Sequence, residues 1–215
     1  MNSVVDKKYE ELDSTVQSIS EDNCLLLSTM SMSRIWFLIK FISTQKGFEK
    51  LAILDSLLDG AVDKVYNKTI FSDEKLQGYI DICNELILIM EEYTDDEGIS
   101  EFGSNVMGFA YTLIELLYYF IDMQGIIMKP GNREGCKKFI VIAAVAIEQY
   151  LDTIYHNLKD PKFIKAKINE SELLIKEIKR IDEDIIFLES NSIDKSKVVD
   201  RINTYKTLNI LLEMI

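Results

Sequence analysis

The 215-residue sequence has few of the residues that metal centres and catalytic triads need. It contains one histidine, His156, and three widely spaced cysteines, Cys24, Cys83 and Cys136, with no Cys-x-x-Cys pair. A structural zinc site needs four Cys or His ligands, and a di-iron bundle needs two Glu-x-x-His pairs. We therefore predict no metal site, no cofactor and no catalytic residues. The expected protein is non-enzymatic, and its cysteines are buried thiols.

Proline and glycine are also scarce, with two and nine residues, which argues against a collagen-like or linker-like chain. Apolar residues make up 47% of the sequence, and they recur at helical spacing along the whole chain. The sequence therefore predicts an all-α, single-domain bundle of about seven to eight helices over residues 1–215. Residues 1–22 could form an N-terminal helix that is only loosely attached.

No hydrophobic run is long enough to suggest a membrane span. The longest apolar segment, Val106 to Ile121, has 16 residues and includes Glu115, whereas a membrane-spanning helix needs about 20 residues. We expect this segment to be the very apolar central helix of the bundle. The N-terminus is polar and acidic, unlike a signal peptide. These features predict a cytoplasmic protein that does not bind a membrane.

Start signals for helices occur in the C-terminal half. Asp160 followed by Pro161 is typical of an N-cap with proline at the first helical position. Asn169, with Glu172 three residues later, has the pattern of a capping box and predicts a second start. We therefore expect one helix to begin at the proline and another to begin after Asn169.

The run from Phe139 to Ile147 is apolar throughout and could be a buried strand. Helical spacing continues beyond it, which favours a helix. A C-terminal antiparallel pair of helices is expected to close the bundle. The other expected helices cover Val4 to Ser18, Asn23 to Ser43, Phe48 to Tyr66, Ser72 (as N-cap) to about Tyr93, and Ser104 to Met123.

Positive charge is missing from one long segment. No Lys or Arg occurs from Leu76 to Met128, although the chain carries 24 basic and 36 acidic residues, for a net charge of −12. Clustered like charges repel one another, and a basic partner would relieve that repulsion. A solvated acidic loop that keeps the protein soluble is the alternative. The candidate partner-binding residues are Glu91, Glu92, Asp95, Asp96, Glu97 and Glu101.

A short basic stretch follows later in the chain. Lys159, Lys162, Lys165 and Lys167 lie around Phe163. Such a stretch could bind nucleic acid or anionic lipid. The net charge of −12 and the absence of a further basic stripe argue against both. We interpret the stretch as a solvated helix start that could pair with the acidic segment, and we predict no nucleic-acid partner.

Two further functions are compatible with the pattern. Aromatic residues of the apolar segment, among them Tyr111 and Tyr118, could line the pocket of a small-molecule-binding regulator. A structural homodimer is also possible, and it would require an exposed apolar stripe on the C-terminal helix pair. These alternatives are distinguished by an enclosed pocket in the first case and by the stripe in the second.

Four stretches, read in order, resemble a known group of proteins. They are MSRIWFLIKFISTQKGFEKL (32–51), SEFGSNVMGFAYTLIELLYYFID (100–122), AAVAIEQYLDTIYHNL (143–158) and NESELLIKEIKRIDEDI (169–185). Their order resembles that of the all-helical bacterial polymorphic-toxin immunity proteins, in particular immunity family six. A weaker resemblance is to the YjaG-like helical family. The similarity extends over about residues 25–190, and no catalytic motif accompanies either family.

The resemblance to immunity proteins implies a non-enzymatic inhibitor that binds and blocks a cognate toxin domain. Many toxin domains that cut nucleic acid are basic, and an acidic protein associates quickly with such a surface. The six candidate acids would then form part of the surface that binds the toxin. Because immunity folds do not encode the activity of the toxin, the reaction that is blocked stays open.

Overall fold

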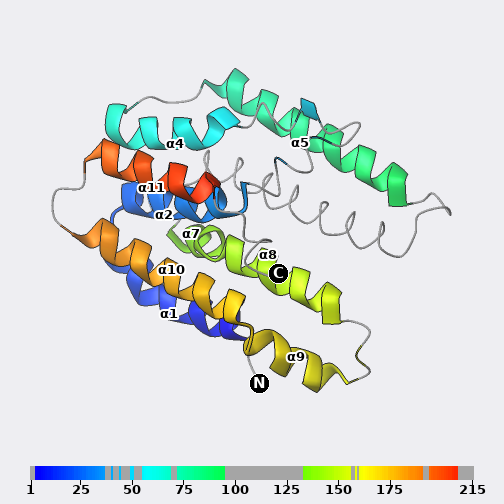
Figure 1. The fold of residues 1–215 in the computed structure, drawn as a ribbon. Coiled ribbons are helices and arrows are strands. Elements are labelled where there is room, and N and C mark those ends of the chain that lie inside the picture. Colours follow the sequence, from blue (N-terminus) through cyan, green and yellow to red (C-terminus); the bar gives the residue numbers. More distant parts are fainter. Residues whose placement is uncertain are drawn as a thin grey trace.

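The computed structural model describes residues 3–36, 40, 44, 49–50, 55–68, 72–94, 133–155, 158, 160–190 and 194–207, apart from the side chains of 55, 90–94, 133–135 and 153. These ranges contain nine α-helices and no strand (Figure 1). The predicted all-α bundle is therefore confirmed. The segment expected to form the apolar central helix, Val106 to Ile121, lies outside the described residues.

The helices follow one another along the chain with short connections between most of them. Their bounds are α1 Val4–Ser18, α2 Glu21–Arg34, α4 Asp55–Asn67, α5 Asp73–Thr94, α7 Arg133–Ile140, α8 Ile142–Tyr155, α9 Pro161–Asn169, α10 Glu172–Glu189 and α11 Lys195–Thr207. The predicted start after Ser72 is confirmed, since its Oγ accepts a hydrogen bond from the Lys75 N–H at 3.2 Å. The helix expected from Phe48 is described only from Asp55.

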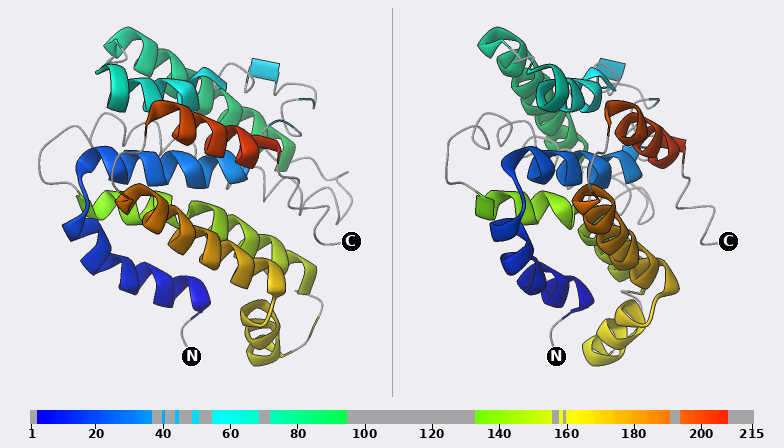
Figure 2. Two further views of the ribbon diagram at one scale, coloured as in Figure 1. Left: turned by 60° about the vertical axis from the view of Figure 1, so that its left-hand side comes forward. Right: turned by 90° about the vertical axis from the view of Figure 1, so that its left-hand side faces the viewer.

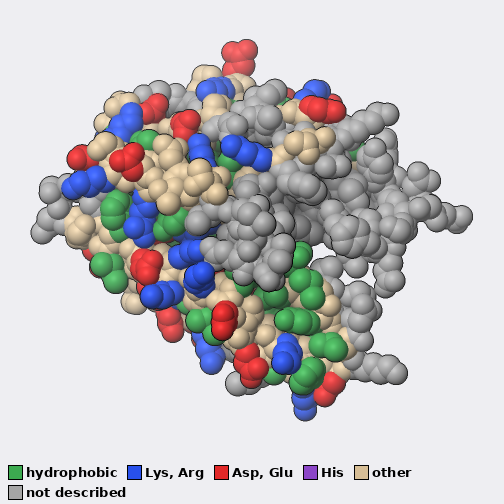
Figure 3. Space-filling view, in the orientation of Figure 1, with side chains coloured by type: hydrophobic (Ala, Val, Ile, Leu, Met, Phe, Trp, Pro, Cys, Tyr) green, Lys and Arg blue, Asp and Glu red, His purple; other side chains and the backbone are tan. Residues whose placement is uncertain are grey.

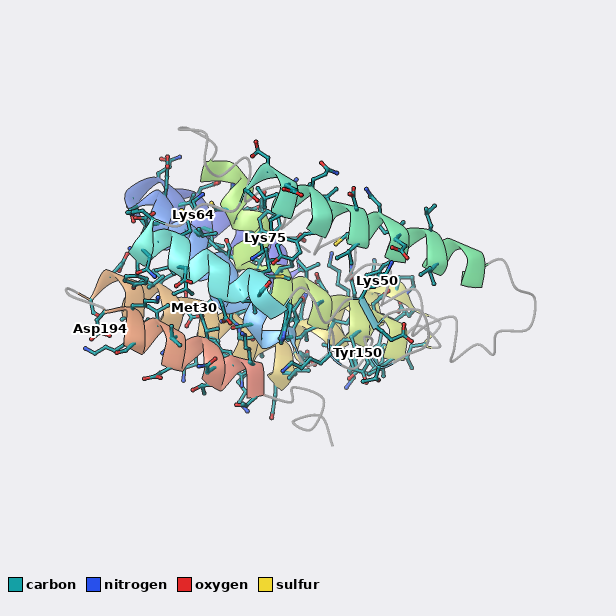
Figure 4. The ribbon with its side chains drawn as sticks, turned by 90° about the horizontal axis from the view of Figure 1, so that it is seen from above. Met30, Lys50, Lys64, Lys75, Tyr150 and Asp194 are labelled. Atoms are coloured by element: carbon teal, nitrogen blue, oxygen red, sulfur yellow. The ribbon has the colours of Figure 1, made fainter. Side chains whose placement is uncertain are left out.

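The helix α2 is at the centre of the described bundle. It packs against α4, α7, α8, α10 and α11, and both ribbon views of Figure 2 show other helices on several sides of it. Every residue from Cys24 to Arg34 is buried. Figure 4 looks down on the bundle and places Met30 of this helix among its neighbours. The sequence predicted one helix over Asn23 to Ser43; α2 ends at Arg34, and most of the predicted span beyond Trp36 lies outside the described residues.

Serine and threonine hydroxyls make this burial possible. Ser28 Oγ donates to the carbonyl of Cys24 at 2.9 Å, and Thr29 Oγ1 donates to that of Leu25 at 2.8 Å. Such bonds satisfy a buried hydroxyl inside its own helix, so the side chain needs no partner elsewhere. A helix with small hydroxyl residues between its Leu and Met residues can therefore be enclosed completely.

Ser31 differs, because its hydroxyl joins α2 to another helix. Its Oγ accepts a hydrogen bond from the backbone N–H of Ala143 at 3.3 Å. Ala143 is in the first turn of α8, where an α-helix has no carbonyl of its own to offer its N–H groups. The run from Phe139 to Ile147 is helical, as predicted, but it is interrupted at Val141 between α7 and α8. Ser31 thus supplies a hydrogen-bond acceptor for an N–H group next to this interruption.

The two capping patterns predicted in the C-terminal half have different outcomes in the structure. Asp160 caps α9 by accepting from the Lys162 N–H at 2.9 Å, and Pro161 opens the helix, as predicted. The capping box expected at Asn169 is wrong, because α10 begins at Glu172 with Ser171 as its N-cap. Asn169 instead ends α9, and its Oδ1 accepts from the Val4 N–H at 3.0 Å. A tertiary contact has replaced the local cap.

The first helix, α1, belongs to the common core. Val5, Leu12 and Val16 are buried in the same hydrophobic cluster as residues of α2, α8, α10 and α11. Two buried lysines also hold it in place: Lys8 of α1 binds Asp182 of α10, and Lys137 of α7 binds Asp13 of α1. The N-terminal helix is therefore joined to the bundle by apolar packing and by charge.

The C-terminal helices α10 and α11 run antiparallel, as predicted (Figure 1). Both pack against α2, and α11 also packs against α4. Two isoleucines are exposed on α10, Ile175 and Ile186, and the exposed residues between them include the charged Lys179 and Asp182. The described part of the pair therefore carries no continuous apolar stripe of the kind that a homodimer through these helices would need.

A matched pair of substitutions tests the link between α2 and α8. Ser31→Ala removes the acceptor for the Ala143 N–H, and leaving a buried donor without a partner costs about 1–3 kcal/mol. Ser28→Ala removes only a hydroxyl that bonds within its own helix, so its free energy of unfolding should change by less than about 0.5 kcal/mol. Urea unfolding followed by circular dichroism measures both. Equal destabilisation of the two variants would contradict the bridging role of Ser31.

Candidate partner-binding surface

The helix α5 carries the described part of the acidic segment. Its inward face consists of Tyr79, Cys83 and Leu86, which are buried and follow helical spacing. Its outward residues include the exposed carboxylates of Asp73, Glu74, Asp81 and Glu85. The helix is thus amphipathic, and its solvent-facing side is acidic.

The six predicted binding residues lie beyond this described surface. Glu91 and Glu92 belong to the last turns of α5, but their side chains are not described. Asp95, Asp96 and the later members, Glu97 and Glu101, lie outside the described residues. The described residues therefore do not test whether the six carboxylates lie close together. It shows that the helix leading to them is already acidic on its exposed side.

Part of the acidic face of α5 is neutralised by other residues. Lys50 lies beside α5 (Figure 4), and its Nζ is 2.7 Å from both carboxylate oxygens of Glu85. Asp81 accepts from Gln77 Nε2 at 2.8 Å. Both side chains of the Lys50–Glu85 pair are about half exposed, so such a pair contributes at most about 1 kcal/mol. A basic partner could compete with Lys50 at little cost.

A buried ionic cluster, which the sequence did not predict, lies at the end of α2. Arg34 is 1% exposed, and it contacts two carboxylates of α10, Glu177 and Asp184, which are equally buried. Its Nε donates to Glu177 Oε1 at 2.5 Å, and its Nη1 donates to Asp184. The two acids lie on the buried face of α10 together with Leu174, Ile181 and Leu188.

The helix α11 completes this cluster. Arg201 Nε donates to Asp184 Oδ1 at 2.6 Å, and the Tyr205 hydroxyl donates to the same oxygen at 2.7 Å. The guanidinium of Arg34 also lies over the ring of Tyr205, 4.9 Å from its centroid. Asp184 therefore accepts from α2 and from α11 at once, which joins three helices through one carboxylate.

The protonation of the cluster follows from its burial. Burial alone would lower the pKa of Arg34, but attraction by Glu177 and Asp184 raises it above its ordinary value, so the guanidinium is charged. Burial raises the pKa of Glu177, and the nearby Arg34 opposes that rise. Burial and the negative Asp184 together raise the pKa of Tyr205, so its hydroxyl keeps its proton and donates it. Arg34, Asp184, Arg201 and Tyr205 bind one another, and Glu177 pairs with Arg34 through one of its oxygens, which favours a structural role.

The basic stretch forms the exposed side of α9. Lys162, Lys165 and Lys167 are exposed there, and Lys167 Nζ is 5.6 Å from the centroid of the Phe163 ring. Lys159 lies outside the described residues. In Figures 1 and 2, α9 and α5 lie at opposite ends of the bundle, so the described part of the acidic segment does not pair with these lysines.

The other sequence-based candidates have mixed outcomes. Cys24, Cys83 and Cys136 are buried thiols that form no disulfide, as predicted. His156 and the tyrosines proposed as pocket walls, Tyr111 and Tyr118, lie outside the described residues. Across the ranges that the structure describes, no three His, Cys, Asp or Glu side chains are grouped as metal ligands would be. Within the same ranges, no helix combines the length and the apolar character that a membrane crossing requires.

Comparison of the chain with protein-family models, with curated proteins and with solved structures gave no significant match. The functional argument therefore depends on the surfaces and charges of this chain itself.

Replacing Arg34 tests the buried cluster. Arg34→Met leaves two buried carboxylates without their main cation, which should lower the free energy of unfolding by about 3–5 kcal/mol. Adding Glu177→Leu removes one of these carboxylates and should recover part of the loss. As a control, Lys179→Gln removes an exposed pair with Glu183 and should cost less than about 0.5 kcal/mol. Chemical unfolding measures all three, and a neutral Arg34→Met would show that the cluster does not support the fold.

The burial of the cysteines predicts slow thiol chemistry. Burial raises the pKa of Cys83 to about 12, so at pH 8 it holds on the order of a thousandfold less thiolate than a free cysteine. Ellman's reagent should therefore react slowly with the native protein and quickly with all three thiols in guanidinium. Rapid labelling of Cys83 in the native state, mapped by mass spectrometry, would contradict the burial.

Proposed function

We propose that this chain is a non-enzymatic binding protein that neutralises a cognate bacterial toxin through an acidic surface. The surface begins on the exposed side of α5 and continues into the six acids from Glu91 to Glu101. One observation carries the proposal: the outward side of α5, where the base-free segment of the sequence begins at Leu76, is acidic. The order of helices that resembles immunity proteins supports the same conclusion.

Charge explains why such a surface suits a toxin. Carboxylates of one sign on neighbouring turns repel each other, which opposes the compact state of the free protein. A basic partner removes that repulsion on binding and is attracted from a distance, so association is fast and depends on salt. A cytoplasmic inhibitor benefits from fast association because it must capture the toxin before the toxin acts.

The proposal is tested by co-expression with the protein encoded by the neighbouring gene, followed by co-purification. We expect a tight complex whose dissociation constant rises steeply as salt is added. A tight complex that does not respond to salt would place the interface on apolar surface. No complex would contradict the proposal.

Charge reversal then locates the surface. Glu91→Lys combined with Glu92→Lys should raise the dissociation constant of the complex by about tenfold or more and should weaken its salt dependence. Glu189→Lys combined with Asp200→Lys changes the net charge equally at exposed positions of α10 and α11. This control should alter the dissociation constant by less than about threefold. Calorimetric titration measures both, and equal effects would mean that only the overall charge matters.

A further inference from the structure

Exposed apolar side chains gather at one corner of the bundle. The described chain has six large apolar residues that are clearly exposed, and four of them lie between residues 154 and 175. They come from the end of α8, the link after it, α9 and the start of α10, elements that pack on one another. Figure 3 shows apolar side chains beside lysines over this corner. The four residues, which are 38–50% exposed, are Ile154, Leu158, Phe163 and Ile175.

The outward face of α9 has an ordered pattern of charge. Lys162, Ala166 and the C-cap residue Glu170 are four residues apart and therefore lie along one face of the helix, with Phe163 beside them. Lys162 and Glu170 are exposed at opposite ends of this face, and the small Ala166 lies midway. The side of α9 that packs on the bundle is different, because it holds the buried Ile168.

The charges around this face balance, unlike those of the whole chain. Three exposed lysines of α9 are bracketed by three exposed acids, Asp160 before it and Glu170 and Glu172 after it. A patch of one sign would repel a copy of itself, whereas a patch with both signs around an apolar centre can be complementary to its own copy. Although the chain has a net charge of −12, the described charges at this corner balance, so it does not strongly repel a copy of itself.

We propose that the outward face of α9, together with Ile154, Leu158 and Ile175, is the interface of a symmetric dimer of this chain. A two-fold axis near Ala166 sets two α9 helices antiparallel. Lys162 of each copy then faces Glu170 of the other, and the two ion pairs lie about 12 Å apart along the helices. Ala166 allows the helices to approach closely, and the apolar residues around it are covered. This inference does not depend on the proposed toxin partner.

Sedimentation velocity of the full chain over about a hundredfold range of concentration tests the dimer. We expect a monomer–dimer equilibrium in the wild type. Phe163→Asp should weaken the dimer by about tenfold or more, because a buried charge would replace an apolar ring next to the two-fold axis. Ile186→Asp, at an exposed position of α10 outside the patch, should leave it unchanged. Circular dichroism and the Tm confirm that each variant folds.

A charge exchange identifies the pairing itself. Lys162→Glu and Glu170→Lys each place like charges opposite one another, so each variant alone should dimerise about tenfold more weakly. An equimolar mixture of the two restores both ion pairs and should return the dissociation constant to within about threefold of the wild type. A wild type that stays monomeric, a dimer that Phe163→Asp does not affect, or a mixture that fails to recover would each overturn the proposal.

Discussion

The buried charge of Arg34 is the constraint on which the rest of the bundle depends. A guanidinium without water needs carboxylates within hydrogen-bond distance, because an unpaired buried charge costs several kcal/mol. Both carboxylates come from α10, and one of them, Asp184, is shared with Arg201 and Tyr205 of α11. The packing of α10 and α11 around α2 is therefore set by charge as well as by apolar contact.

Burying α2 requires a helix that has no exposed side. From Cys24 to Ser33 it holds no charged residue, and three of its hydroxyl side chains bond to carbonyls of the helix itself. The charge that follows this uncharged run, Arg34, is at the C-terminus of the helix, where a cation also interacts favourably with the helix dipole. The uncharged composition of this run and the C-terminal position of the one arginine together allow the helix to be buried.

The arrangement separates the two surfaces that the proposals use. The acidic helix α5 and the mixed-charge helix α9 lie at opposite ends of the bundle (Figures 1 and 2). A partner bound on the described, exposed side of α5 would therefore leave α9 accessible. Screening at physiological salt, with a Debye length of about 8 Å, also limits the repulsion that distant acids exert on the α9 corner.

The sequence by itself determined what depends on neighbouring residues in the chain. Helical spacing predicted the all-α bundle, and local chemistry predicted the start of α9 at Asp160 and Pro161 and of α5 after Ser72. The tertiary structure decided what depends on distant residues. Asn169 bonds to Val4 instead of capping a helix, and Glu177 and Asp184 look like surface acids until Arg34 is placed against them. Whether a polar group is buried depends on partners far along the chain, and spacing within one helix contains no information about them.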